Sequence, residues 1–359
     1  MQPRAVSSGG VVASRPIADE QKPGLPPARE SWPTVEQFLA YRDEELSLAD
    51  PVVMNLVVAK GIPALANLDI DRYVRLADEW AGDLRARMPA KEREFHRRPH
   101  DWRSDIDFFR LGLVCWYCDV VLGVAYREDQ RNVDEKTGIR YTDPTHLFLN
   151  GVMDTRRGTC GNMALLHVVL GRRVGLPVHL ACVWAHFLCR FDNGVKTINI
   201  EATETGRGGF SSSPDDYILA QHKMPAKAQE CGSDLRALTA RETLVMFLYT
   251  RARHFEDTEQ YQDAEREYLL ARYLFPRHRR LYMSQTQLSV WRSTHLFDAD
   301  EKGHITGLVE YLQGLVRAAP WAGKPAGQPV RVTQEPKERR NGLCVDAVLQ
   351  EIIAGRGFM

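Results

Sequence analysis

The sequence has no apolar stretch long enough to cross a lipid bilayer. Its longest apolar run, Leu111–Tyr126, is shorter than the ~20 residues that a membrane-spanning helix needs, and it contains Asp119. Residues 1–16 also contain no apolar segment of the length that a secretory signal requires, because small and polar residues dominate them. We therefore expect a cytoplasmic protein in which Leu111–Tyr126 is a buried helix.

An excess of charge of either sign is absent, and cysteine is scarce. Lys and Arg total 47 and Asp and Glu total 47, so no overall field favours nucleic acid, an anionic membrane surface or acidic substrates. Seven cysteines in 359 residues are neither dense nor even in number, which argues against a disulfide framework and for reduced thiols. They are Cys115, Cys118, Cys160, Cys182, Cys189, Cys231 and Cys344. Function is therefore expected to reside in a localised site.

The composition divides the chain into segments, and its length suits two folded units with tails. The first residues are rich in Pro, Gly and Ser, whereas apolar residues recur at three- and four-residue spacing from Pro33 onward. Asp50-Pro51 and Asp69–Asp71 are typical helix starts, while Met88-Pro89 and Arg98-Pro99 interrupt the pattern. We predict a disordered tail (1–32), a helical region (33–145), an α+β core (146–232), a second helical region (233–320), and a linker with one short helix (321–359).

The α+β core is predicted from a change of periodicity. Thr159–Val174 carries apolar residues on one helical face, and Gly175 follows as a left-handed cap. Val178–Phe191 is dense in β-branched and aromatic residues. Asp192-Asn193-Gly194 is a strong turn signal, after which Val195–Glu201 returns as the partner strand. The sequence thus predicts a helix packed on an antiparallel hairpin.

Cys160 is the candidate nucleophile, because it lies where the predicted core helix begins. A thiol in the first helical turn feels the positive end of the helix dipole, and Arg156 and Arg157 add positive potential. Gly158 and Gly161 are expected to leave room for a substrate backbone. These conditions favour a thiolate near neutral pH. The alternative is a buried cysteine that packs as a small hydrophobic residue.

A nucleophilic thiol needs a base, and His186 on the first predicted strand is the candidate. The alternative is a hydrogen-bonded core histidine. His167 lies roughly 10 Å from Cys160 along the helix axis, which is too far for direct proton transfer. His146 and His179 are weaker alternatives as the base.

The base needs an orienting group, and Asn199 and Glu201 share one face of the partner strand. Either side chain can hold the imidazole in the required tautomer. The alternative for Glu201 is a solvated carboxylate at a strand end. For the oxyanion, the backbone N–H of Cys160 is the natural donor, with Asn150 or Asn162 as a side-chain partner.

Four segments together resemble the transglutaminase-like superfamily. They are Arg156-Arg-Gly-Thr-Cys-Gly, Gly171-Arg-Arg-Val-Gly-Leu-Pro177, Ala185-His-Phe187 and Asn199-Ile-Glu-Ala-Thr203. Within that superfamily the sequence is similar to the branch built like the SirB-type invasion regulators, and the resemblance extends over most of Asp50–Pro276. It implies a papain-like core flanked by a helical N-terminal region and tetratricopeptide-like helices.

The resemblance also implies that nucleophile, base and acid follow in the order Cys, His, Asp. Cys160 and His186 match this pattern, and Glu201 falls where the superfamily has Asp before Ala-Thr. Many members of this branch have lost the cysteine, so its presence here favours activity. The longer glutamate side chain needs a shifted backbone to reach His186, and Asn199 therefore stays an alternative as a papain-like orienting amide.

Two sets of residues with metal-binding types are interpreted as structural. Cys115-Trp-Tyr-Cys118 has redox or zinc spacing, yet no second cysteine pair accompanies it and it lies within an apolar helical run. In the set of Cys182, His186 and Cys189, strand alternation puts Cys182 on the face of His186 and Cys189 on the other. These three residues are therefore not expected to bind one ion, and no metal or cofactor is predicted.

The second helical region carries a tetratricopeptide-like pattern of small and aromatic residues followed by a proline. The residues are Leu248, Ala252, Phe255, Ala264, Tyr268, Ala271 and Pro276. A helix pair of this kind either presents a groove to a peptide or partner, or packs to cap the core.

The leading hypothesis is a cysteine-dependent hydrolase or acyltransferase that acts on a peptide, isopeptide or amide bond, with hydrolysis favoured over transamidation. Cys160 attacks, His186 transfers the proton, and Glu201 or Asn199 orients it. The rival hypothesis is a non-catalytic protein-binding or regulatory scaffold with the same fold. Both imply a protein or peptide as substrate or partner. An activated thiol in an open cleft favours the enzyme, and a buried thiol favours the scaffold.

Overall fold

The computed structural model describes most of the chain between residues 31 and 281. The described residues are 31–131, 138–183, 186–204, 210–222, 232, 234–276, 278 and 281. Nearly all of the predicted tail, the end of the second helical region, and the predicted linker with its short helix (321–359) lie outside them.

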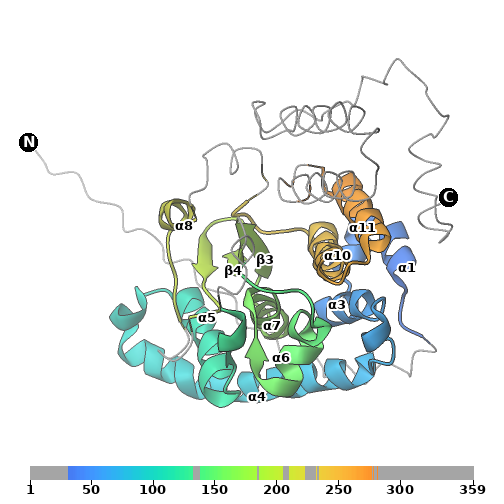
Figure 1. The fold of residues 1–359 in the computed structure, drawn as a ribbon. Coiled ribbons are helices and arrows are strands. Elements are labelled where there is room, and N and C mark those ends of the chain that lie inside the picture. Colours follow the sequence, from blue (N-terminus) through green and yellow to red (C-terminus); the bar gives the residue numbers. More distant parts are fainter. Residues whose placement is uncertain are drawn as a thin grey trace, which may run out of the picture. The chain divides into compact units, whose positions relative to one another are not determined.

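Helices make up most of the described fold, and a small sheet interrupts them (Figure 1). The α-helices are α1 (Val35–Ala40), α2 (Asp43–Ser47), α3 (Pro51–Ala59), α4 (Ile70–Arg97), α5 (Ile106–Trp116), α6 (Leu149–Thr155), α7 (Cys160–Arg173), α8 (Asp215–Gln221), α10 (Ala240–Asp257) and α11 (Tyr261–Leu274). Shorter turns are η1 (Pro63–Leu65), η2 (Pro99–Trp102), the π-helical η3 (Tyr117–Val121), η4 (Glu128–Gln130) and η5 (Pro144–His146). None of the described helices combines the length and apolarity needed to cross a membrane.

Two of the predicted helix starts are confirmed, and one predicted break is wrong. Asp50 accepts a hydrogen bond from the N–H of Val52 at the start of α3, and Asp69 caps α4 in the same manner. α4, however, continues through Pro89. Pro89 is exposed while Met88 beside it is buried, so water can satisfy the carbonyl that proline leaves without a donor.

The sheet consists of β3 (Val178–Val183), β4 (His186–Asp192) and β5 (Thr197–Ile200), antiparallel and in that order. The predicted turn at Asp192-Asn193-Gly194 is confirmed, because it joins β4 to β5. Gly194 has φ +79° there, a conformation that glycine adopts without steric cost.

The prediction of one strand over Val178–Phe191 is wrong. The chain reverses between Val183 and His186, which are register partners of β3 and β4. Both strands are buried, so apolar residues continue across the reversal and give no polar turn signal. The reversal changes which side chains share a face, and this affects the candidate site.

Two short parallel strands lie directly before α7. β1 (Ala125–Tyr126) pairs with β2 (Arg157–Gly158), and the N–H of Arg127 donates to the carbonyl of Gly158 at 2.8 Å. The apolar run Leu111–Tyr126 is therefore helical only in its first part. Gly123, with φ +68°, ends the helical segment before β1 begins.

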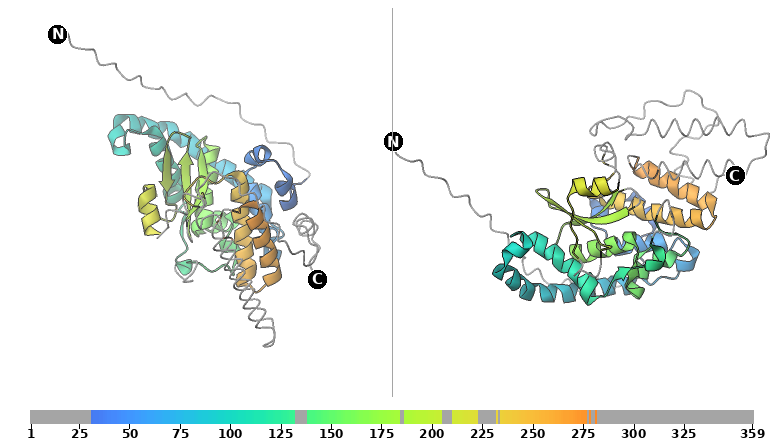
Figure 2. Two further views of the ribbon diagram at one scale, coloured as in Figure 1. Left: turned by 90° about the horizontal axis from the view of Figure 1, so that it is seen from above. Right: turned by 60° about the vertical axis from the view of Figure 1, so that its left-hand side comes forward.

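α7 is the central helix of the described fold. It is buried on most of its circumference, and it packs on β3 and β4 as well as on α4, α5 and α6. Figures 1 and 2 show α7 between the sheet and α4, with α8 over the opposite face of the sheet. The predicted packing of the helix Thr159–Val174 on an antiparallel sheet is thereby confirmed, although the sheet has three strands where the sequence predicted two.

α10 and α11 pack along each other, and α10 also packs on α2 and α3. Arg251 of α10 donates to the carbonyl of Val58 at 3.0 Å and forms a buried ion pair with Glu267 at 2.6 Å. The predicted pair of helices is therefore present and contributes to the core. Its assignment as a tetratricopeptide unit stays a prediction.

α10 also holds the chain segment that leads toward the nucleophile. The N–H of Tyr141 donates to Asp257 at 2.9 Å, and the Tyr141 carbonyl lies 2.8 Å from Nδ1 of the buried His254. Arg253 lies over the Tyr141 ring at 5.2 Å. The last turns of α10 thus fix a residue that precedes α6 and α7 in the chain.

Candidate active site

Cys160 is the first residue of α7, as predicted, and its thiol has little solvent exposure. Its relative exposure is 9%. The N–H of the preceding Thr159 donates to Oδ1 of Asn162 at 2.8 Å, so a side chain three residues into the helix fixes the entry of the chain. The nucleophile candidate therefore sits on a rigid helix start.

Asn162 has no atom left for an oxyanion. Its Oδ1 is used by Thr159, and its Nδ2 donates to the carbonyls of His146 at 2.9 Å and Phe148 at 3.1 Å. Asn150 is buried in α6 with 4% exposure, and its Oδ1 has no partner among the described residues. Asn162 is therefore a structural tie between the η5 segment and the start of α7.

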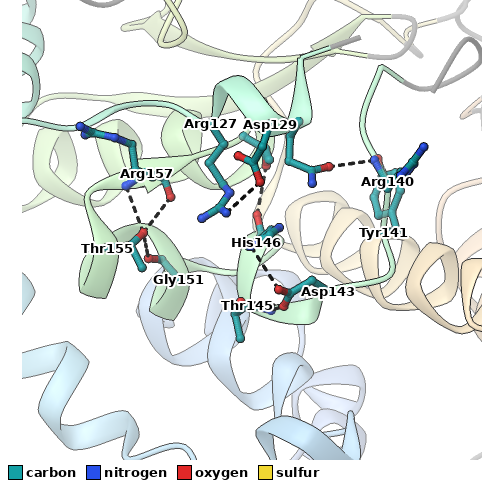
Figure 3. Close-up of polar contacts among 12 residues, drawn as sticks. Arg127, Asp129, Arg140, Tyr141, Asp143, Thr145, His146, Gly151, Thr155 and Arg157 are labelled. Carbon is teal, nitrogen blue, oxygen red and sulfur yellow. Dashed lines mark hydrogen bonds and ion pairs between the residues drawn. The ribbon is translucent and has the colours of Figure 1, made fainter. Parts of the chain in front are cut away.

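The segment that Asn162 holds is braced by further polar contacts (Figure 3). Nε2 of His146 lies 3.1 Å from Oδ2 of Asp143, and its carbonyl accepts from Nδ2 of Asn162. Asp129 pairs with Arg127 at 3.0 Å.

Gly158 has a packing role instead of the predicted clearing role. A Cβ at this position would lie 2.5 Å from Cγ of Met163 and 2.6 Å from Oδ1 of Asn162. At Gly161 the corresponding Cβ would lie 3.6 Å from Phe187, which is an ordinary contact. Only glycine at 158 allows β2 to approach the first turn of α7 this closely.

The two arginines before Cys160 are engaged in contacts of their own. Arg156 lies over the ring of Trp80 at 4.2 Å and donates to the carbonyl of Met153. Arg157 donates to the carbonyl of Gly123 at 3.1 Å. Their positive potential at the Cys160 thiol stays a prediction.

His186, the first residue of β4, lies between the thiol and Glu201. Its ring interacts with both Cys160 and Glu201, and its Nε2 lies 2.6 Å from Oε2 of Glu201. Burial alone would lower the pKa of His186, but the hydrogen bonds and negative charges of Cys160 and Glu201 raise it to about 10. These contacts favour the imidazolium form of His186, and Nδ1 is the nitrogen left for the thiol.

Glu201 is held in place from both carboxylate oxygens. Oε1 accepts from the N–H of Thr203 at 3.0 Å and from its hydroxyl at 2.6 Å, while Oε2 faces His186. Burial opposes ionisation of Glu201, yet these hydrogen bonds and the charge of His186 lower its pKa. The backbone N–H of Glu201 donates to Ser211 at 3.0 Å. Glu201 therefore bonds the imidazole directly, although its side chain is longer than that of aspartate.

Asn199 belongs to a different network. Its Oδ1 accepts from Arg190 at 2.6 Å, and its Nδ2 donates to Asp215 at 2.7 Å and to the carbonyl of Ser213 at 3.1 Å. The oxygen and the nitrogen of the Asn199 amide are therefore both hydrogen-bonded, the oxygen to β4 and the nitrogen to the start of α8. Of the two predicted orienting residues, Glu201 and not Asn199 bonds the imidazole.

His167 and His179, two other histidines considered as the base, have structural roles. Nδ1 of the buried His167 lies 2.8 Å from the carbonyl of Met163, and burial lowers its pKa. Burial likewise lowers the pKa of His179. The thiols of Cys115 and Cys118 are buried, which raises the pKa of both.

The predicted face of Cys182 is wrong, because the chain reverses after β3. Cys182 is the register partner of Phe187, so its side chain lies on the other face of the sheet from the side chain of His186. Its Sγ is 3.1 Å from Nε2 of His278, whereas Cys189 donates to the carbonyl of Ala164 at 2.9 Å. Within the described part of the chain, no group of three or more metal-binding side chains is suited to hold an ion.

Sequence reasoning missed two residues of the site. Tyr126 of β1 is the register partner of Gly158, and burial and the charge of Cys160 raise the pKa of its phenol. His222, just after α8, stacks on His186 with ring centroids 5.3 Å apart and planes at 13°. Tyr126 lies at the end of an apolar run that was predicted to be helical, and no local pattern indicated a role for His222.

The comparison with protein families bears on this arrangement. A model of the transglutaminase-like superfamily matches residues 130–248. The chain contains a transglutaminase-like domain. The matched residues include Cys160, His186 and Glu201 and end within α10. No curated protein and no solved structure matches the chain.

Proposed function

We propose that the protein is a cysteine-dependent acyl-transfer enzyme that hydrolyses a peptide, isopeptide or amide bond. The observation that carries the proposal is the chain of contacts from Cys160 through His186 to Glu201, in which the pKa of His186 is raised to about 10. An imidazolium beside a thiol at neutral pH favours the nucleophilic thiolate. The transglutaminase-like domain supports this reading.

In the proposed reaction the Cys160 thiolate attacks the substrate carbonyl carbon and forms a C–S bond. His186 then gives its proton to the leaving nitrogen as the C–N bond breaks, which leaves a thioester on Cys160 and releases the amine. Water attacks the thioester with His186 as general base, and the acid product leaves. Glu201 keeps Nε2 of His186 engaged, so that Nδ1 faces the sulfur throughout.

Charge on the carbonyl oxygen needs donors while the tetrahedral intermediate exists. The backbone N–H of Cys160 lies in the first turn of α7, at the positive end of the helix dipole, and is the first proposed donor. Tyr126 is the proposed second donor, because β1 lies beside Gly158 and the raised pKa keeps its phenol protonated.

The rival function, a non-catalytic binding scaffold, is favoured by one observation. Cys160 is only 9% exposed, and a substrate must reach its sulfur. The side chains of His186 and Glu201 are 16% and 25% exposed, so the pair is accessible from the imidazole side. We place the enzyme first because a scaffold has no need of an imidazolium held between a thiol and a carboxylate.

The test is acylation of the purified full-length protein by p-nitrophenyl acetate, followed by intact mass and by p-nitrophenol release. Wild-type protein should gain one acetyl group on Cys160 and turn over, while Cys160→Ala should do neither. An added primary amine distinguishes the two acyl-transfer outcomes, since hydrolysis gives acetate and transamidation gives the acetylated amine. Equal release by wild type and Cys160→Ala would favour the scaffold. A panel of fluorogenic peptide amides then identifies the bond class.

A further inference from the structure

One face of β4 presents three side chains in a row. His186, Leu188 and Arg190 are two residues apart and therefore point to the same side of the sheet. This side is opposite to Cys189, whose thiol reaches Ala164 of α7. The row thus lies on the α8 side of the sheet, as the layers in Figures 1 and 2 show, and His186 at its end also reaches Cys160 at the start of α7.

Each side chain of this row meets one residue of the α8 segment. Arg190 forms two hydrogen bonds with Asp215, at 2.9 and 3.1 Å. Leu188 shares an apolar cluster with Ile218. His186 stacks on His222.

Asp215, Ile218 and His222 follow the three- and four-residue spacing of one helix face. α8 therefore runs along β4 and is fixed at three successive points. The last of these points is the candidate base. Asn199, with hydrogen bonds to both Arg190 and Asp215, strengthens the first point.

The contact at the third point is a parallel stack. The ring centroids of His186 and His222 are 5.3 Å apart and their planes differ by 13°, which is within the range of an attractive offset stack. Burial and the positive charge of His186 lower the pKa of His222. A neutral imidazole therefore covers one face of an imidazolium.

We propose that His222 is a positioning residue, which holds the His186 ring in the plane where its two nitrogens meet Cys160 and Glu201. This inference rests on the proposed function. The flat ring of His222 blocks rotation of His186 about its χ2 bond and excludes water from one side of both hydrogen bonds. Within the described residues, the titratable groups that lie against His186 are Cys160 and Glu201 at its edges and His222 on its face.

The test uses full-length protein with isotopically labelled histidine, and it reads the pKa of His186 from its ring resonance. The resonance is assigned by its loss in His186→Gln. His222→Ala should lower the pKa of His186 by about one unit or more toward the ordinary ~6.5, because the freed ring loses its hydrogen bonds. His222→Phe should keep the wild-type pKa, since a flat ring remains. Tyr217→Ala, on the same helix at a residue that is 58% exposed, is the matched control and should also keep it.

A second reading follows alkylation of Cys160 by iodoacetamide as a function of pH. Its inflection should move upward in His222→Ala and stay in place in His222→Phe. His222→Gln, which also lacks the flat ring, replaces His222→Ala if the latter does not fold by circular dichroism. An unchanged His186 pKa in the alanine or glutamine variant would overturn the proposal, as would an equal shift in the phenylalanine variant.

Failure of the proposed function gives a different pattern. If wild-type Cys160 is not acylated but His222→Ala still lowers the pKa of His186, the enzyme assignment fails and the positioning role stands. If wild-type Cys160 is acylated and the pKa of His186 is indifferent to His222→Ala, the positioning role fails alone.

Discussion

His186 and Glu201 are joined by a 2.6 Å contact between Nε2 and Oε2, although a glutamate stands where the transglutaminase-like pattern has an aspartate. The extra methylene is accommodated because Thr203 holds the other carboxylate oxygen with two hydrogen bonds. The carboxylate is thereby folded back toward its own backbone.

Removal of the Glu201 charge should impair turnover and leave the fold intact. Glu201→Gln keeps the size of the side chain but not the charge, so the pKa of His186 should fall and acyl turnover should drop on the order of 10²-fold or more. Thr203→Val removes one of the two hydrogen bonds to Oε1 and should have a smaller effect. Turnover of p-nitrophenyl acetate measures both. Equal turnover of Glu201→Gln and wild type would show that the carboxylate is not part of the mechanism.

Cys160 should react with iodoacetamide at lower pH than a free thiol does. The ordinary pKa of a cysteine is about 8.5, and the imidazolium of His186 favours the anion. His186→Ala should move the inflection upward, because the thiolate loses its counter-charge. Site-resolved mass spectrometry against glutathione as a reference thiol measures this. If Cys160 is labelled no faster than the buried Cys189 in both wild type and His186→Ala, its thiol is structural.

Tyr126→Phe should separate two reactions of the same thiol. Loss of one oxyanion donor typically costs about 10²–10³-fold in turnover, so hydrolysis of an ester or amide should fall. Alkylation by iodoacetamide forms no oxyanion, and its rate should stay near that of wild type. A parallel loss of both rates would assign Tyr126 a structural role.

The stability of the folded protein should decline at alkaline pH through His186. Between about pH 6.5 and 8.5 the folded chain holds a proton on His186, while the unfolded chain holds one on the Cys160 thiol, so the two states bind equal numbers of protons. Above about pH 8.5 the unfolded thiol is ionised too, and up to about pH 10 only the folded chain holds the His186 proton. In that range the free energy of unfolding should fall with rising pH, by at most about 1.4 kcal/mol per pH unit. Urea titrations of wild type and His186→Gln measure the difference, and identical slopes above about pH 8.5 would contradict the raised pKa.

Two glycines near the nucleophile should respond oppositely to a methyl group. Gly158→Ala places a Cβ 2.5 Å from Met163 and should destabilise the fold by about 1–3 kcal/mol through overpacking. Gly161→Ala makes only a 3.6 Å contact with Phe187, and because Ala favours helix over Gly, stability should be kept or rise. Thermal unfolding compares the two. Equal midpoints would mean that β2 can move away from α7.

The sequence sufficed for the parts of the site that rest on local pattern. The left-handed Gly175 after α7, the helical face of α7 and the turn at Asp192-Asn193-Gly194 are all local signals, and the structure has each of them. The strand reversal after Val183 was missed because two buried strands read as one apolar run. The error then propagated to the face assigned to Cys182.

The sequence alone could not decide the role of residues that depend on long-range contacts. Asn199 and Glu201 share a strand face, and only the position of Arg190 and Asp215 explains why the amide is drawn away while the carboxylate stays with the imidazole. Tyr126 reaches the site through a strand pairing with Gly158 that no periodicity announces.

The contacts of α10 with Tyr141 show that the folded unit extends beyond the segment that matches the family model. The transglutaminase-like match ends at residue 248, within α10, whereas His254 and Asp257, which bind the Tyr141 backbone, lie beyond it. A fragment trimmed to the match would sever α10 and release the chain that approaches the nucleophile. The smallest autonomous version of this site therefore extends at least to the end of α10, and domain boundaries drawn from likeness alone would cut through a cooperative structure.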